Sequence, residues 1–220
     1  PYGHQMATIS LEPPEGNWKL PEQVTGKSVY ALIDLGERKH LLVLDKENES
    51  DTSYSRLHFD ANANGDLTDD QAHTGQLWGG TNHQGGHFQQ IPATVVLQGK
   101  EFPYLLSAQF SAFMPEAKED SEWEPDPQYF HVYISSDSAY HGSFSLDGGT
   151  YDVWLGDGNA NGRFGDFFAP MADREEGQIY GVTDYLFLAG AHEQIGYSHA
   201  QMMGRHLVFG KKVFTVEIDT

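Results

Sequence analysis

The sequence contains no cysteine, few basic residues and no long apolar run. The absence of cysteine among 220 residues excludes disulfide bonds, thiolate metal sites and cysteine nucleophiles. Lysine and arginine number 13 against 32 acidic residues, which gives a formal net charge of −19 at pH 7. Such a chain repels phosphate backbones, so we expect no nucleic-acid partner. No apolar run approaches the roughly 20 residues that span a bilayer, so we expect no membrane insertion.

Two catalytic signatures and regular helices are also lacking. The chain has no Gly-x-Ser-x-Gly nucleophile elbow and no glycine-rich phosphate loop between a strand and a helix. Helical periodicity is scarce, and residues 191–203 are the best candidate for a short helix. Hydrophobic residues make up 39% of the chain, aromatic residues 13%, and there are 24 glycines. This composition is typical of a globular domain that is rich in turns.

Alternating apolar and polar residues predict a mainly β fold. We expect two related β halves, packed as a sandwich or as two adjacent sheets, with few short helices. Residues 99–100 and 147–149 are predicted turns, and the glycine-rich residues 79–86 are predicted to form a loop. The expected strands are residues 28–35, 40–44, 54–59, 91–98, 101–110, 129–134, 141–146, 150–155, 206–209 and 211–218.

An acidic stretch divides the chain. Residues 115–127 read PEAKEDSEWEPDP, with proline at both ends and few apolar side chains. This pattern favours a surface linker. We therefore expect an N-terminal β half over residues 1–114 and a C-terminal β half over residues 128–220.

Each half contains an Asp-x-Asn-Ala-Asn-Gly segment. Residues 60–69 and 157–166 are separated by a constant offset of 97, and six of their ten positions are identical. Tyr54 and Tyr151 upstream are also identical at this offset. An internal duplication is the simplest explanation.

The two segments have the oxygen pattern of a calcium-binding loop. Calcium takes about six to eight oxygen ligands, which a curled loop supplies from alternate residues. Loop positions 1, 3, 5 and 10 supply side-chain oxygens, and position 7 supplies its carbonyl oxygen. Position 6 is Gly65 or Gly162, which permits a sharp turn, and position 8, Leu67 or Phe164, is expected to point inward. The predicted ligands are Asp60, Asn62, Asn64, Asp66 and Asp69 in the first loop, and Asp157, Asn159, Asn161, Arg163 and Asp166 in the second.

This pattern resembles the first half of the EF-hand calcium loop. It departs from it at position 12, where an EF-hand has a bidentate glutamate and this chain has Gln71 or Phe168. The expected flanking elements are strands, so the sequence resembles the EF-hand-like calcium-loop modules hosted by β-rich domains of secreted bacterial proteins. The resemblance covers about ten residues per copy. It implies Ca²⁺ as the bound ion, and Asp70 and Asp173 are further candidate carboxylates for the first and second loop.

Two readings of these segments remain open. Asn-Gly is also a common tight turn, although two copies with the same alternation and the same distal aspartate favour calcium. Neutral asparagine ligands predict weak binding, with dissociation constants on the order of 10⁻⁴–10⁻³ M. Such a site fills only in a calcium-rich compartment, so we expect an extracytoplasmic location: periplasmic, cell-surface or secreted.

Two histidines are candidate zinc ligands. His83 and His87 have the spacing of zinc ligands on one face of a helix. Gly85 and Gly86 between them disfavour a helix, so the segment predicts a plain polar loop.

The function that these features favour is a calcium-stabilised, non-catalytic module that serves binding or assembly, with an unidentified glycan or protein partner. The alternative is a carbohydrate-active protein, either a sugar-binding module or a glycoside hydrolase fragment. Trp78 and Trp123 lie in expected polar loops, where tryptophan can stack on sugars. Glu122 and Glu124 flank Trp123, but no sequence feature selects a catalytic pair of carboxylates.

Overall fold

The computed structural model describes residues 4–24, 27–48, 51, 53–80, 83–113, 126–167, 183–191 and 193–217. The chain divides into two compact units. The N-terminal unit is Met6–Ile134, and the C-terminal unit comprises Pro1–Gln5 and Ser135–Thr220. Each unit carries one of the two predicted loops.

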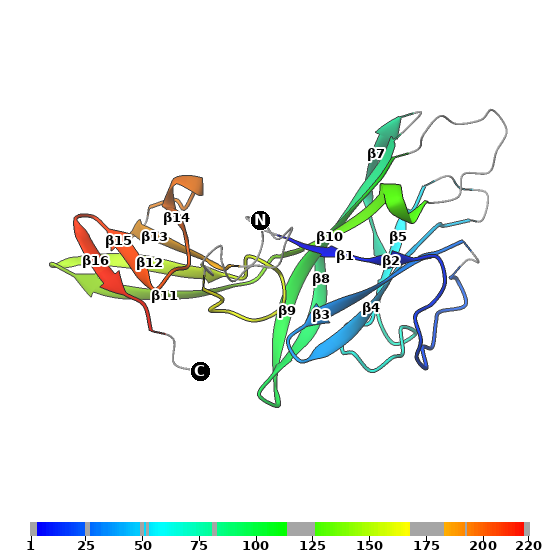
Figure 1. The fold of residues 1–220 in the computed structure, drawn as a ribbon, viewed down its shortest axis with the longest axis horizontal. Helices are drawn as coiled ribbons and strands as arrows, with labels where there is room; N and C mark the ends of the chain where they lie inside the picture. The colour runs from blue at the N-terminus through cyan, green and yellow to red at the C-terminus, as the bar shows by residue number, and fades with distance from the viewer. Residues whose placement is uncertain are drawn as a thin grey trace. The chain divides into compact units, whose positions relative to one another are not determined.

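The N-terminal unit is built on two five-stranded sheets (Figure 1). One sheet has the order β2-β3-β4-β5-β6, with strands Ile9–Ser10, Val29–Leu35, Arg38–Asp45, Arg56–Phe59 and His73–Thr74. The other has the order β1-β10-β9-β8-β7, with strands Gln5–Ala7, Phe130–Ser136, Lys100–Phe113, His83–Leu97 and Gln76–Gly80. The β8–β9 hairpin, green in Figure 1, is the longest pairing of the unit.

Aromatic rings hold the two sheets together. The Tyr54 ring, just before β5, lies 6.0 Å from Phe110 of β9 and 5.5 Å from Phe130 of β10, edge to face in both cases. All three side chains are buried. Such edge-to-face pairs add to the burial of the rings themselves.

The outer face of the β2–β6 sheet is covered as well. Leu41 and Val43 of β4 pack with Leu67 in a second apolar cluster, which includes Trp18 and Leu20 from the segment before β3. Strand β4 is therefore buried on both faces from its third residue onward. A strand covered on both sides reads as a continuous apolar run, and the sequence of β4 does so.

The C-terminal unit has a four-stranded antiparallel sheet and a separate hairpin. Its core contains Leu186, Leu188 and Leu207, against which Val153 and Leu155 pack. The sheet order is β11-β12-β13-β14, with strands Ala139–Leu146, Gly149–Gly156, Tyr185–Gly190 and Ala200–Met202, and the hairpin is β15–β16, with strands His206–Phe209 and Lys212–Thr215.

The mainly β fold is confirmed. Across the described ranges the only helical turns are two short 3-10 turns, η1 (Pro127–Tyr129) and η3 (Tyr197–His199). The helix expected over residues 191–203 is wrong, because Ala200–Met202 pairs with β13 as an edge strand. Most of the expected linker, residues 115–125, lies outside the described residues.

The loop expected over residues 79–86 is also wrong. These glycines lie in β7 and β8, where a Cβ on Gly85 would meet the Trp78 indole at 2.4 Å and one on Gly86 would meet the Phe110 ring at 2.4 Å. The absence of a Cβ at Gly85 and Gly86 allows the Trp78 and Phe110 rings to lie over the strand. The turn of the β8–β9 hairpin lies one residue earlier than the expected residues 99–100, because Leu97 pairs with Lys100 and the turn is residues 98–99.

Among the described residues, no helix is both long enough and apolar enough to cross a membrane.

The β11–β12 turn provides a test of local backbone strain. Asp147 and Gly148 have φ of 51° and 82°, as a two-residue type I′ turn requires. We expect Gly148→Ala to destabilise the C-terminal unit by about 1 kcal/mol, because a Cβ there meets no atom of the described residues within 4 Å, so the positive φ alone opposes it. Gly196→Ala is the matched control, with open space and an ordinary φ, and it should cost nothing. Urea denaturation measures both, and equal stabilities of the two variants would contradict the turn.

Candidate metal centre

The two predicted loops begin at equivalent places. Asp60 directly follows β5, and Asp157 directly follows β12. The backbone then takes the same path in both loops. Position 4 has a positive φ, 55° at Ala63 and 53° at Ala160, and so does position 6, 81° at Gly65 and 77° at Gly162. A non-glycine residue at positive φ is uncommon, so its recurrence at one loop position shows that the two loops share a conformation.

The first aspartate organises each loop. In the first loop, Asp60 Oδ1 accepts the Asn64 N–H at 3.0 Å and Oδ2 accepts the Gly65 N–H at 3.0 Å. In the second loop, Asp157 makes the same pair of bonds, at 3.3 Å from the position-5 N–H and 2.7 Å from the position-6 N–H. Both aspartates are buried, at 0% and 5% exposure. The loops thus curl around the first carboxylate, and each of its oxygens keeps further acceptor capacity.

The asparagines turn their amide oxygens inward in the same way. Asn62 Oδ1 accepts the Asn64 N–H at 2.9 Å, and Asn64 Oδ1 accepts the Asp66 N–H at 2.7 Å. In the second loop the corresponding distances are 3.3 Å, from Asn159 Oδ1 to the Asn161 N–H, and 2.8 Å, from Asn161 Oδ1 to the next N–H. These successive side-chain bonds fix the orientation of the amides.

The position-10 aspartates join the same clusters. Asn64 Nδ2 donates to Asp69 Oδ2 at 2.9 Å. In the second loop, Asn159 Nδ2 and Asn161 Nδ2 both donate to Asp166 Oδ2, at 2.9 and 2.8 Å. The structure therefore brings together the side chains at positions 1, 3, 5 and 10 in both copies.

Position 7 directs its side chain elsewhere. The Lys19 ammonium lies 2.7 Å from Asp66 Oδ2, and together with the Thr68 hydroxyl it lowers the pKa of the Asp66 carboxyl to about 2. Arg163, at the same position of the second loop, is exposed. Only the backbone carbonyl of this position remains for the loop interior, which explains why the two residues differ in charge.

Position 8 anchors each loop, as expected. Leu67 is fully buried in the cluster under the N-terminal segment. Phe164 is half-buried and packs edge to face on Tyr140, with ring centroids 4.5 Å apart. The anchor is therefore more deeply buried in the first loop than in the second.

A buried aspartate that sequence reasoning missed supports the second loop. Asp184 accepts the N–H groups of Gly158, Gly165 and Asp166, the first and last at 2.9 Å. In the first loop, Asp70 takes part of this role by accepting the Ala61 N–H at 3.2 Å. The two carboxylates accept the N–H at loop position 2 in both loops, although Asp70 comes directly after the first loop and Asp184 comes from just before β13.

The sequence offered three further positions near the loops. Gln71, at position 12, is exposed. Phe168 and Asp173 lie outside the described residues.

Burial shifts both supporting carboxylates in the same direction. It raises the pKa of Asp70 to about 6, with the neighbouring carboxylates of Asp69, Asp60 and Asp66 adding to the rise. It also raises the pKa of Asp184 to about 6, in spite of the three N–H groups that favour its charged form. Each loop is thus closed by a carboxylate for which ionisation is costly.

The donor set suits calcium better than zinc. Within the described ranges, no three His, Asp or Glu side chains converge as a metal site. Each loop instead supplies two carboxylates and two neutral amides. Carboxylate, amide and carbonyl oxygens are hard ligands that Ca²⁺ accepts. Four side-chain oxygens per loop, with the position-7 carbonyl oxygen expected from the sequence as a fifth, leave room for water to complete the coordination, so the residues present fit a Ca²⁺ ion.

The remaining sequence candidates do not form a site. His83 and His87 lie on the extended strand β8, so their Cα atoms are about 13 Å apart, too far to share a metal ion. Trp78 is 40% exposed, but it covers Gly85 of the adjacent strand rather than projecting from a loop. Glu122, Trp123 and Glu124 lie outside the described residues.

Comparisons with protein-family models, with curated proteins and with solved structures found no match to this chain.

Proposed function

We propose that this chain is a calcium-binding, non-catalytic β-rich module of an exported bacterial protein, in which the two loops hold structural Ca²⁺ ions. The observation that supports this most strongly is the shared geometry of the loops. Positions 4 and 6 have positive φ in both, and the first carboxylate accepts the N–H groups of positions 5 and 6 in both. An ordinary Asn-Gly turn needs neither a buried first aspartate nor a distal one.

Each loop supplies one shell of oxygens. Asp60, Asn62, Asn64 and Asp69 would bind the first ion through their side chains, and Asp66 through its carbonyl oxygen. The corresponding ligands of the second ion are Asp157, Asn159, Asn161 and Asp166, with the carbonyl oxygen of Arg163. A Ca²⁺ ion supplies positive charge where the carboxylates of a chain with a net charge of −19 repel one another.

The structural role follows from where the loops are attached. The first loop is clamped by the N-terminal segment, because Lys19 N–H donates to Gly65 O at 2.8 Å and Leu67 N–H donates to Lys19 O at 2.9 Å. The second is clamped by the start of β13, because Asp184 N–H donates to Asp166 O at 3.0 Å. An ion in either loop would therefore fasten a strand end to a distant part of the same unit. Two carboxylates per loop favour weak binding and hence an extracytoplasmic location.

Terbium luminescence tests the first loop directly. The Trp18 indole lies against Gly65, 3.9 Å from the position of a Cβ built there. We expect Tb³⁺, which takes calcium-like oxygen sites, to show Trp-sensitised emission that millimolar Ca²⁺ displaces. Mg²⁺ should displace it poorly, because it demands near-octahedral geometry and dehydrates reluctantly.

The matched control is Trp18→Phe. It should abolish the sensitised emission from the first loop and leave calcium binding measured by calorimetry intact. Sensitised emission that Asp60→Asn leaves unchanged, or that Ca²⁺ does not displace, would contradict the proposal.

A further inference from the structure

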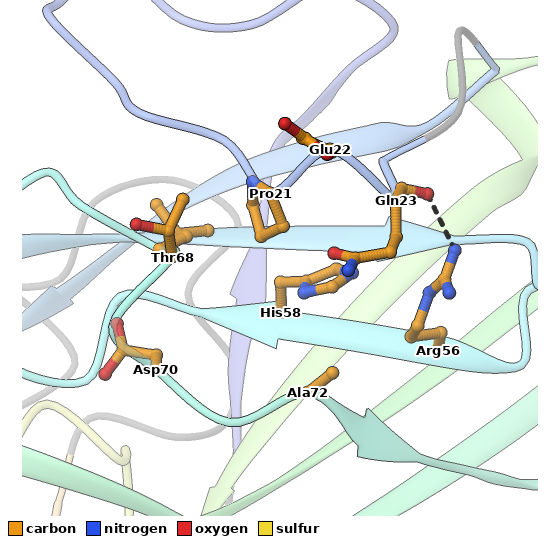
Figure 2. A pocket seen from close by; sticks show the side chains of 9 residues that line it. Pro21, Glu22, Gln23, Arg56, His58, Thr68, Asp70 and Ala72 are labelled. Carbon is orange, nitrogen blue, oxygen red and sulfur yellow. Dashed lines mark hydrogen bonds between the residues drawn. The ribbon is translucent and has the colours of Figure 1, made fainter.

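A pocket of about 650 Å³ opens beside the first loop, within the N-terminal unit (Figure 2). Arg56 and His58 of β5 form one side of it, residues 21–23 lie opposite them, and Thr68 and Asp70 close the end next to the loop. Figure 2 shows the His58 ring and the Arg56 guanidinium on the same side of β5, facing Pro21 and Gln23. The volume is within the range of about 300–1,000 Å³ that is usual for small-molecule sites.

Within the described part of the chain, two buried polar atoms on side chains that line this pocket have no hydrogen-bond partner. They are Nε2 of His58, whose side chain is only 4% exposed, and Nε of Arg56. Buried polar groups in native proteins are nearly always paired with protein, ordered water or a ligand. Both atoms belong to side chains that line this cavity, so these side chains mark the part of its wall where a bound molecule would be recognised.

The second copy shows that these polar side chains are not needed to host the loop. At the offset of 97, Arg56 corresponds to Val153 and His58 to Leu155. Val153 and Leu155 pack in the apolar cluster of the C-terminal unit. One copy thus fills this face of the loop-bearing strand with apolar packing, and the other keeps it polar and hollow.

The charges around the pocket disfavour an anion. The Arg56 guanidinium is already paired with Asp45, with Nη2 2.6 Å from Oδ2, and Nη2 also donates to the carbonyl oxygens of Gln23 and Lys46 at 2.8 Å. Glu22 and Asp70 add carboxylates to the pocket wall. A ligand must therefore offer an acceptor to the Arg56 guanidinium and donors to these carboxylates without a negative charge of its own.

A hydroxyl group meets each of these demands, since it both donates and accepts. It can pair with an imidazole nitrogen of His58 in either tautomer. Pro21, Leu67 and Ala72 add apolar surface to the pocket, against which the C–H face of a sugar ring can pack. We propose that this pocket binds one neutral sugar unit, a free monosaccharide or the end of a glycan, through His58, Arg56 and Asp70.

The test is a panel of four monosaccharides: glucose, galactose, mannose and N-acetylglucosamine. Saturation-transfer NMR detects binding on the sugar, and the spectrum of ¹⁵N-histidine-labelled protein detects it at the His58 imidazole. We expect at least one sugar to receive saturation and to shift the His58 imidazole resonances. His58→Leu, which copies Leu155 of the strand that leads into the second loop, should lower the affinity for that sugar about tenfold, as the loss of one buried hydrogen bond implies. His206→Leu, at an exposed position of β15, is the matched control and should leave the affinity unchanged.

A second variant keeps the test independent of folding. Ala72→Phe places a ring in the pocket from an exposed backbone position and should block the sugar while leaving the circular dichroism spectrum unchanged. Failure of every sugar to bind would overturn the proposal, and so would sugar binding that neither variant weakens. The proposal would also be overturned if inorganic phosphate, rather than a sugar, shifted the His58 imidazole resonances. In those cases water alone, or an anion, would fill the pocket.

This proposal goes beyond the calcium module and does not depend on it, because Arg56 and His58 are not among the proposed ion ligands. The measurement is run with calcium and with EDTA. Sugar binding in both conditions supports the proposed sugar site. Sugar binding in calcium alone also supports it, because an ion-filled loop would hold Thr68 and Asp70 in place. Absence of calcium binding alongside normal sugar binding would overturn the module proposal only.

Discussion

Replacing Asp184 with alanine is expected to destabilise the C-terminal unit by about 3–5 kcal/mol. The side chain is fully buried and accepts the N–H groups of Gly158, Gly165 and Asp166. A buried donor left without a partner costs about 1–3 kcal/mol. Alanine leaves one buried donor, Gly158 N–H, and two part-buried donors, Gly165 N–H and Asp166 N–H, while also opening a small cavity. Urea denaturation followed by Trp154 fluorescence, in EDTA so that ion binding does not contribute, measures the loss.

The matched variant is Asp70→Ala in the N-terminal unit. Asp70 accepts a single backbone N–H, from Ala61, so its removal should cost only about 1 kcal/mol. Equal effects of the two variants, or an Asp184→Ala protein as stable as the wild type, would show that Asp184 does not hold the second loop closed.

Calcium is expected to raise the unfolding temperature by several degrees. With dissociation constants on the order of 10⁻⁴–10⁻³ M, about 10 mM calcium stabilises each loop by roughly 1.4–2.7 kcal/mol. For units of this size that is an upward shift of roughly 3–10 °C. Differential scanning calorimetry in calcium and in EDTA measures it, and the double variant Asp60→Asn/Asp157→Asn should lose most of the shift.

Asp66→Asn is the control within the first loop. Its carboxylate is paired with Lys19 rather than directed into the loop, so the variant should keep the calcium-dependent shift in full. Loss of the shift in Asp66→Asn but not in the double variant would place the ion outside the proposed shell. An unfolding temperature that calcium leaves unchanged would reduce the loops to ordinary turns.

Local features of the site were predictable from the sequence because they are contiguous in the chain. The alternation of Asp60, Asn62 and Asn64 specifies which side chains turn inward. The glycine at position 6 indicates the positive φ that Gly65 adopts. The strands that lead into the loops follow from the apolar alternation of residues 54–59 and 150–155, so the placement of both loops at strand ends was also expected.

Features that depend on tertiary pairing were not predictable. Asp184 follows Asp157 by 27 residues, and no spacing rule connects it to the loop that it supports. Residues 200–202 form a strand only because β13 offers them an edge. Gly85 and Gly86 looked like loop residues, since a sequence does not reveal that the Trp78 and Phe110 rings lie over them. The pocket at His58 likewise exists only once residues 21–23 fold across β5.

The two matching loops have different surroundings. Both loops keep the oxygen pattern, but the strand that carries the first loop presents Arg56 and His58, and the strand that carries the second presents Val153 and Leu155. A loop that serves only stability can tolerate this divergence around it. The two copies therefore separate the proposed structural role of calcium, common to both, from the proposed sugar site, which belongs to one.

The most direct measurement is a crystal structure of the protein grown in millimolar calcium chloride, with an anomalous difference map. The account predicts one peak in each loop, about 2.3–2.6 Å from side-chain oxygens of Asp60, Asn62 and Asn64 in the first loop and of Asp157, Asn159 and Asn161 in the second. Maps without a peak in either loop, in which Asn64 Nδ2 still donates to Asp69, would contradict it.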